Sequence, residues 1–199
     1  MIVYIDGENA VHQLVDALRH MRKLETREQL IGFNIAELVY ELVGKRDITI
    51  KYYTASLKVL DEESELEEKS REMVSWMRRW DNELHKQNIE VIKAGKLKAR
   101  EGVVCRNCGH QEAFFVEKGV DVRLAVDMMV DPETEKTLIV WSSDADLLPA
   151  LEVVKNRGAR VKNLAHKDAL NWGLARQCGE WQTYGDGQLA KIFDSEGKE

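Results

Sequence analysis

The sequence predicts a three-layer α/β fold around a central, mainly parallel β-sheet. Short apolar segments rich in β-branched residues alternate with longer segments of helical periodicity, which is typical of parallel strands joined by crossover helices. The strand candidates are continuous apolar runs, as expected for strands that helices cover on both faces. A chain of 199 residues is long enough to bury one substantial core, so we expect a single domain.

The apolar runs and the capping signals locate the individual elements. The predicted strands are 2–5, 48–54, 89–94, 137–141 and 160–163. The predicted helices run from Asn34 to Gly44, from Asp61 to about Gln87, over 145–157, and from Lys167 to about Cys178. Asn34 resembles a helix N-cap, and Gly44 and Gly158 are glycines of the kind that end helices.

The segment from Lys96 to Glu117 breaks this alternation. Its arms, 96–104 and 111–117, are predicted to pair as a β-hairpin that is inserted into the α/β core. The domain is therefore predicted to cover 1–194, with the hairpin at about 96–117 and a polar tail at 195–199.

The tip of this hairpin has the spacing of a zinc knuckle. Cys105 and Cys108 form a Cys-x-x-Cys motif, and His110 follows. A structural zinc site needs four ligands, and the sequence has no second Cys-x-x-Cys motif. Zn²⁺ bound with the help of His110, a site shared between the two chains of a homodimer, and unmetallated thiols are the alternatives.

Composition limits the location and the partners. The first residues carry no basic leader, and no apolar run approaches the roughly 18 residues that a membrane-spanning helix needs. We therefore expect a cytoplasmic protein without a membrane partner, and the odd number of cysteines fits a reducing compartment.

Charge does not exclude a nucleic-acid partner. The formal net charge of -6 argues against binding by a general positive field. Two local basic stretches remain: Lys93, Lys96, Lys98 and Arg100, and Lys155, Arg157, Arg160 and Lys162. Either stretch alone is also consistent with an ordinary solvated surface.

Carboxylates follow two of the predicted strands. Asp6 ends the first strand, with Asn9 close behind, and Asp144 and Asp146 follow the strand at 137–141. Ligands bind at the carboxyl ends of parallel strands, so these side chains are expected to converge. Helix capping is the alternative role for Asp144 and Asp146.

A further carboxylate is expected on a helix that begins near Lys118. Helical periodicity places Asp121 in the middle of the apolar face with Leu124 and Met128, where an unpaired carboxylate needs a cation, donors or a proton. Asp127 lies about 120° away, near Arg123, so an i, i+4 ion pair is its alternative role.

Oxygen ligands from several carboxylates suit Mg²⁺ or Mn²⁺. Such ions orient water and stabilise charge on a phosphate group. Lys118 is placed to contact a phosphate, and Asn9 to position water or a carboxylate.

Three blocks together resemble the signature of NYN-domain proteins of the LabA-like group, in the PIN-like nuclease superfamily. They are Asp6-Gly-Glu-Asn9, Lys118-Gly-Val-Asp121 with Asp127 downstream, and Ser142-Ser-Asp144-Ala-Asp146. The resemblance spans roughly residues 1 to 165. It implies a Rossmann-like (PIN-like) fold and a metal-dependent nuclease site that acts on RNA. By position it makes Asp6, Asp121, Asp144 and Asp146 the acidic residues, with Asn9, Lys118 and the secondary Asp127 beside them.

Two functions follow from these patterns. The first is a Mg²⁺- or Mn²⁺-dependent endoribonuclease that hydrolyses RNA phosphodiester bonds. The alternative is a non-catalytic module that binds RNA or a nucleotide and holds a metal in its acidic pocket.

Overall fold

The computed structural model of the chain describes residues 1–60, 65–104, 106–109, 111, 113–131 and 137–196. Its strands form one sheet of seven strands in the order β4-β3-β2-β1-β5-β6-β7. The strands are β1 (Ile2–Asp6), β2 (Thr49–Ser56), β3 (Glu90–Glu101), β4 (Ala113–Lys118), β5 (Thr137–Trp141), β6 (Arg160–His166) and β7 (Gly179–Tyr184). Only β4 runs antiparallel to its neighbour within this sheet. The predicted α/β class with a mainly parallel sheet is confirmed.

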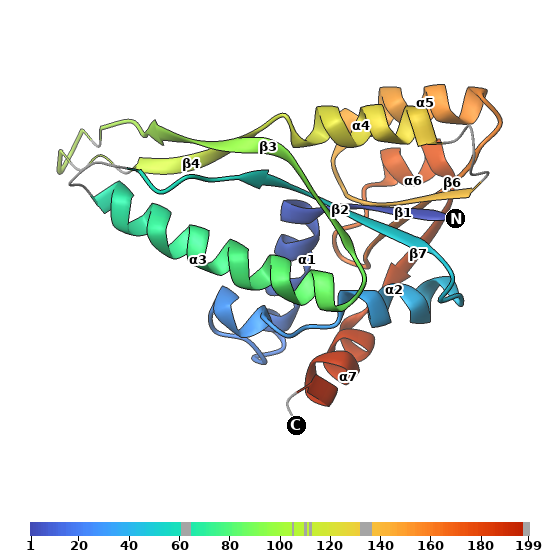
Figure 1. Cartoon of the computed structure of the whole chain (residues 1–199), viewed down its shortest axis with the longest axis horizontal. Helices are drawn as coiled ribbons and strands as arrows, with labels where there is room; N and C mark the ends of the chain where they lie inside the picture. The colour runs from blue at the N-terminus through green and yellow to red at the C-terminus, as the bar shows by residue number, and fades with distance from the viewer. Residues whose placement is uncertain (61–64, 105, 110, 112, 132–136, 197–199) are drawn as a thin grey trace.

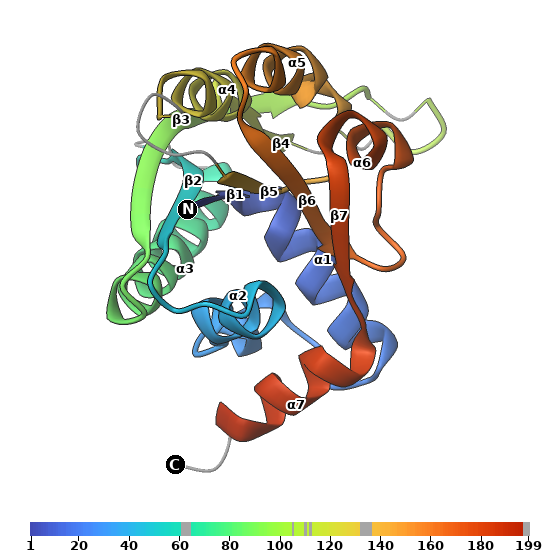
Figure 2. The ribbon, with the colours of Figure 1, turned by 90° about the vertical axis from the view of Figure 1, so that its right-hand side faces the viewer.

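Helices cover both faces of the sheet. They are α1 (Gly7–His20), α2 (Ile35–Val43), α3 (Glu65–Lys86), α4 (Val120–Val130), α5 (Leu148–Asn156), α6 (Trp172–Cys178) and α7 (Asp186–Glu196), with short 3₁₀ turns at Arg27–Leu30 and Ala145–Leu147. Figures 1 and 2 show α4, α5 and α6 on one side of the sheet and α1, α2, α3 and α7 on the other. This gives three layers.

Each face of the sheet buries its own hydrophobic core. On one side, residues such as Leu14, Leu38 and Trp80 pack against the sheet, and on the other Leu124, Leu151 and Leu174 do so. Neighbouring residues of a strand point to opposite faces, so Val3 and Ile5 join the first core while Tyr4 joins the second. β1 is therefore buried along its whole length, as its continuous apolar run predicts.

The order of the strands reverses at β1 and β5. These two strands are hydrogen-bonded neighbours, with Ile5 opposite Trp141. From this pair the chain continues outward in opposite directions, through β2 to β3 on one side and through β6 to β7 on the other. In open α/β sheets such a switch point is where ligands bind, at the carboxyl ends of the strands.

The predicted hairpin is part of this sheet. The strand expected at 89–94 and the first hairpin arm form one continuous strand, β3, which pairs in parallel with β2 and then in antiparallel with β4. The first half of β3 thus belongs to the core, and its second half, paired with β4, extends beyond it as a two-stranded ribbon (Figure 1).

Several helix boundaries differ from the predicted ones. The segment 145–157 begins as a 3₁₀ turn before α5, and α6 begins at Trp172 and not at Lys167. Asn34 caps α2 by accepting the Glu37 backbone N–H at 2.9 Å, and Gly44 ends it in the left-handed region, as predicted. The expected helix start at Asp61 lies outside the described residues, and α1, β7 and α7 were not predicted.

Gly7 joins β1 to α1 and lies so close to β2 that any side chain at this position would clash with it. A Cβ atom at this position would lie 2.5 Å from the Tyr53 carbonyl oxygen and 2.6 Å from the Tyr52 ring. We therefore expect Gly7→Ala to lower the free energy of unfolding by about 1–3 kcal/mol, measured by urea denaturation. The matched control is Gly187→Ala in α7, where nothing lies within 4 Å and helix propensity favours alanine by up to about 1 kcal/mol. Equal stability of the two variants would contradict this account.

Candidate acidic site

Asp6 is a buried carboxylate at the carboxyl end of β1. Its side chain is 4% exposed, and it accepts hydrogen bonds from the Ser142 hydroxyl at 2.8 Å and from the Asn9 backbone N–H at 3.3 Å. Burial raises the pKa of Asp6 to about 6, the two hydrogen bonds lower it, and the negative charges of Asp121 and Asp144 raise it further. Asp6 thus caps α1 and also lies within the electrostatic reach of two other predicted site residues.

Asp144 lies across the switch point, just after β5. One of its carboxylate oxygens accepts the backbone N–H of Asp146 at 2.9 Å, so it caps the 3₁₀ turn, as the alternative interpretation proposed. Its own N–H donates to the Ser142 hydroxyl oxygen at 3.0 Å, and that hydroxyl in turn donates to Asp6. Ser142, which was not predicted as a site residue, therefore ties the ends of β1 and β5 together.

Asp121 lies in the first turn of α4. Val120, Leu124 and Met128 form the buried stripe of this helix, and Asp121 flanks that stripe at intermediate exposure instead of lying at its centre. Burial raises the pKa of Asp121, and the charges of Asp144 and of the exposed Asp146 raise it further. All four predicted aspartates are thus electrostatically coupled, although they come from separate elements.

Glu117 is a fifth coupled carboxylate, which the sequence did not reveal. Burial raises its pKa to about 7, and the charges of Glu8, Asp6 and Asp121 add to the shift. The register of β4 pairs Glu117 with Leu97 of β3. The available signal was a carboxylate that directly follows the apolar run Phe-Phe-Val and directly precedes Lys118.

The two flanking residues, Lys118 and Asp127, differ in their contacts. Lys118 is exposed at the end of β4, opposite Lys96. Asp127 accepts hydrogen bonds from the Tyr53 hydroxyl at 2.9 Å and from Arg123 Nε at 2.8 Å, so the expected i, i+4 pair is present. These bonds give Asp127 a role in fastening α4 to β2.

Among the described residues, no lysine, arginine or histidine forms an ion pair with the carboxylates of Asp6, Asp121, Asp144 or Glu117. The nearby carboxylate of Glu8 differs, because it forms ion pairs with Arg27 and His12. Burial raises the pKa of Glu8, but these two partners together lower it by more, so that it lies below its usual value. Uncompensated carboxylates of this kind fit a hard divalent cation such as Mg²⁺ or Mn²⁺.

In the described part of the chain, no three of the predicted aspartates bring their carboxylate oxygens within 4.8 Å of one another. In His166, Asp168 and Asp186 the ligand atoms all lie within 4.8 Å of one another. His166 Nε2 lies 3.2 Å from Asp186, and Lys167 Nζ lies 2.5 Å from that carboxylate. Lys167 thus neutralises the cluster from within, whereas the aspartates around Asp6 lack such a cation and repel one another.

Gln13 connects this histidine cluster to the acidic site. Its side-chain oxygen accepts three hydrogen bonds, from Trp141 Nε1 at 3.3 Å, the His166 backbone N–H at 2.8 Å and the Tyr184 hydroxyl at 3.1 Å. Its side-chain nitrogen donates to Asn9 at 2.6 Å and to the Ser143 hydroxyl at 3.1 Å. The buried Gln13 amide therefore fixes Asn9, whose carbonyl oxygen also accepts the Ser143 N–H at 3.1 Å.

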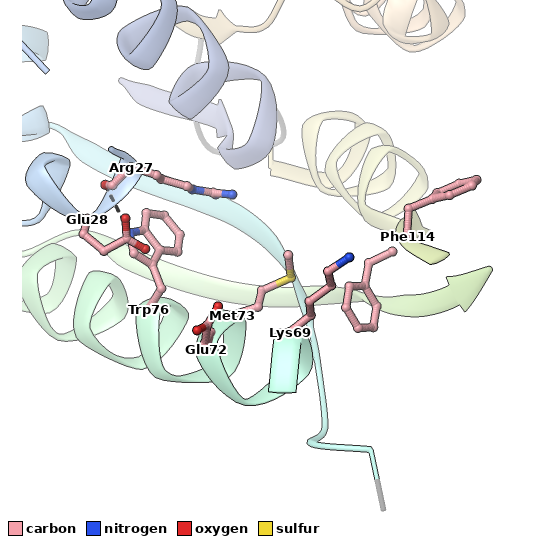
Figure 3. A pocket seen from close by; sticks show the side chains of 8 residues that line it. Arg27, Glu28, Lys69, Glu72, Met73, Trp76 and Phe114 are labelled. Atoms are coloured by element: carbon pink, nitrogen blue, oxygen red, sulfur yellow. Dashed lines mark hydrogen bonds between the residues drawn. The ribbon is translucent and has the colours of Figure 1, made fainter. Parts of the chain in front are cut away.

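Two adjoining pockets open beside the acidic site. One, of about 390 Å³, runs from Glu8 and Glu117 past Leu97 to Trp76. The other, of about 370 Å³, continues along α3 (Figure 3). In Figure 3 the Arg27 guanidinium lies above the Trp76 ring, at 3.8 Å from its centroid.

The zinc-knuckle hypothesis stays a prediction. Cys105 and His110 lie outside the described residues, and Cys108 is an exposed free thiol. In the part of the chain that is described, no helix combines the length and the apolar character needed to cross a membrane.

The chain matches one protein family in sequence and a solved structure in fold. The model of the NYN domain family matches residues 1–183. A protein of unknown function from Vibrio parahaemolyticus has a similar fold, with a TM-score of 0.55 and 13% identity over 92% of this chain and 90% of that chain. A Sir2 enzyme structure aligns with 99% of this chain and 92% of its own length at 11% identity, with a TM-score of 0.39. A search of curated proteins found no match.

The raised carboxyl pKa values predict how stability depends on pH without metal. The folded state binds the protons of Asp6 and Glu117 more tightly than the unfolded state does, because the pKa values are about 6 and about 7 in the fold. This stabilisation is complete below the unfolded pKa values of about 4 and is lost as the pH rises through the folded values. We expect the free energy of unfolding in EDTA to fall by roughly 2 kcal/mol for Asp6 alone between pH 4 and pH 8.

Urea denaturation of Asp6→Asn and Glu117→Gln tests this source of the pH dependence. Both variants should show a flatter pH dependence than the wild type. Asp168→Asn is the control, since this side chain is 75% exposed. A wild-type pH dependence in Asp6→Asn would contradict the assignment.

The Gln13 contacts predict a large cost of removing its amide. Gln13→Leu leaves buried donors of Trp141 and Tyr184 without their acceptor, so the free energy of unfolding should fall by about 2–4 kcal/mol in urea denaturation. In Gln188→Leu, a partly exposed residue loses one bond from the Gly185 N–H, and the change should stay within about 1 kcal/mol. Similar costs for both variants would show that the Gln13 contacts add little.

Proposed function

Because this chain belongs to the NYN domain family, within the PIN-like nuclease superfamily, we propose that it is a divalent-metal-dependent endoribonuclease. It hydrolyses phosphodiester bonds of RNA at the acidic site around Asp6. The observation that carries this proposal is the group of coupled carboxylates at the switch point, which has no cationic partner among the described side chains.

The residues that would hold the metal are Asp6, Asp121 and Asp144, with Asp146 at the outer edge. When bound, Mg²⁺ or Mn²⁺ supplies Lewis acidity toward a phosphate oxygen and lowers the pKa of a coordinated water. The raised pKa values of Asp6 and Asp121 support this assignment, because burial and, to a smaller extent, the neighbouring carboxylate charges disfavour the ionised forms, and a bound cation would offset both effects.

Other residues of the chain orient the substrate and exchange protons. The carbonyl oxygen of Asn9 is occupied by Gln13 and by the Ser143 N–H, so its amide N–H groups are left to donate to a phosphate or to water. Glu117, with a pKa of about 7, can accept and release a proton near neutral pH. Lys118 directly follows Glu117 and is exposed, so its ammonium group would contact a phosphate oxygen of the substrate.

Cleavage of a labelled RNA in the presence of Mg²⁺ or Mn²⁺ tests the function. We expect Asp144→Asn and Asp6→Asn to lower the rate by about 100-fold or more, because each removes a charge that holds the metal. EDTA should abolish cleavage in the wild type, and a DNA strand of the same sequence is the substrate control.

The histidine cluster provides the matched control for these variants. Asp168→Asn removes a carboxylate from the other group of potential ligands, yet it should keep cleavage within about threefold of wild type, a change of less than 1 kcal/mol. Loss of cleavage in Asp168→Asn but not in Asp144→Asn would move the metal site to the histidine cluster. If the wild type binds RNA but does not cleave it, the enzyme hypothesis is wrong and the non-catalytic binding module is favoured.

A further inference from the structure

The ribbon formed by β3 and β4 has two different faces. Helix α3 runs beneath one face, and Figure 1 shows no helix above the other along the far part of the ribbon. In the antiparallel register Lys96 lies opposite Lys118, Lys98 opposite Val116, and Arg100 opposite Phe114. Because paired residues share a face and side chains alternate along a strand, these six residues lie on one face, which we call the basic ribbon face.

The cations of the basic ribbon face have no acidic partner in the described chain. Lys96, Lys98, Arg100 and Lys118 are all exposed, and none of them forms an ion pair or a side-chain hydrogen bond with another described residue. Lys96 and Lys118 are direct cross-strand partners, and like charges in that arrangement destabilise a sheet. In a chain with a net charge of -6, this arrangement favours a role in binding a polyanion.

Phe114 indicates which kind of polyanion fits this face. This residue is 47% exposed, and the register of the ribbon places it opposite Arg100. Phe114 also lines the pocket that continues along α3, and in Figure 3 its ring points away from Met73 and Lys69 of that helix. Aromatic side chains among cations are the features with which proteins hold single-stranded nucleic acid, because an unpaired base stacks on the ring while the cations follow the phosphates.

The basic ribbon face leads directly to the acidic site. Same-face residues along a strand are about 6.6 Å apart, so Arg100, Lys98 and Lys96 form a row. The row ends at Lys118, and Gly119 then turns the chain with a φ of +89° into α4, where Asp121 lies in the first turn.

We propose that the basic ribbon face binds the backbone of single-stranded RNA on its way to the acidic site, with Phe114 stacking on one unpaired base. The proposal names the substrate class of the nuclease proposed above and rests on that function. It assigns Lys98, Arg100 and Phe114 to binding, at a distance from the carboxylates around Asp6.

Fluorescence anisotropy of the full chain with a labelled single-stranded RNA in EDTA tests this assignment, because binding is then read without cleavage. For single strands, log Kd depends on log salt with a slope of about 0.7 per phosphate contact. Lys98→Gln/Arg100→Gln should therefore lower the slope by about 1.4, and Phe114→Ala should weaken binding at least about fivefold with an unchanged slope. A duplex of the same sequence should bind more weakly than the single strand.

Arg78→Gln/Arg79→Gln is the matched control. Both arginines are exposed on α3, and the variant loses the same charge while it should keep the wild-type slope. The proposal is overturned if both double variants change the slope equally, if neither does, if the duplex binds as tightly as the single strand, or if the wild type binds no RNA at low salt.

The failure of either proposal can be told apart from that of the other. A lower salt dependence of RNA binding in the Lys98→Gln/Arg100→Gln variant, with no cleavage by the wild type in Mg²⁺ or Mn²⁺, supports RNA binding by the ribbon and contradicts the nuclease function. Cleavage that depends on Asp144, combined with a wild-type slope in the ribbon variant, supports the nuclease and overturns the ribbon as the RNA-binding surface.

Discussion

The central constraint on this structure is the negative charge gathered at the switch point of the sheet. Asp6 is almost completely buried, and Asp121, Asp144 and Glu117 lie within its electrostatic reach or that of its neighbours. Burying a carboxylate without a partner costs free energy. Two hydrogen-bond donors reduce this cost, because the Ser142 hydroxyl and the Asn9 backbone N–H both donate to Asp6. Those donors reduce the cost without removing the charge, which leaves the site suited to a cation.

The same region is held in place by groups that never touch Asp6. Gln13 accepts from β5, β6 and β7 through Trp141, His166 and Tyr184, and it donates to Asn9 and Ser143. One buried amide on α1 therefore sets the spacing of three strand ends and the orientation of Asn9. Because an unsatisfied buried donor is expensive, these five bonds fix one arrangement more firmly than packing alone would.

Local sequence predicted the part of this site that depends on strand ends. Asp6 and Asp144 directly follow apolar runs, so their place at the sheet edge could be predicted from the runs themselves. Glu117 could not be predicted, because its burial depends on the register between β3 and β4 and on elements distant in sequence, such as Ala55 of β2. β7 was missed because most of this polar edge strand is exposed, and α1 because it begins at Gly7 with no loop after β1.

The acidic site and the basic ribbon face have opposite electrostatic effects on a phosphate group. A site rich in carboxylates repels phosphates, so a phosphate can approach only if a cation lies at the site or if attraction elsewhere offsets the repulsion. The ribbon extends away from the acidic residues, and its cations are joined to Asp121 by the short Lys118-Gly119 connection. In the proposed function, this separation of the two charges along the pair of strands attracts an RNA strand at one end and delivers it to the carboxylates at the other, which a uniformly acidic or uniformly basic surface could not do.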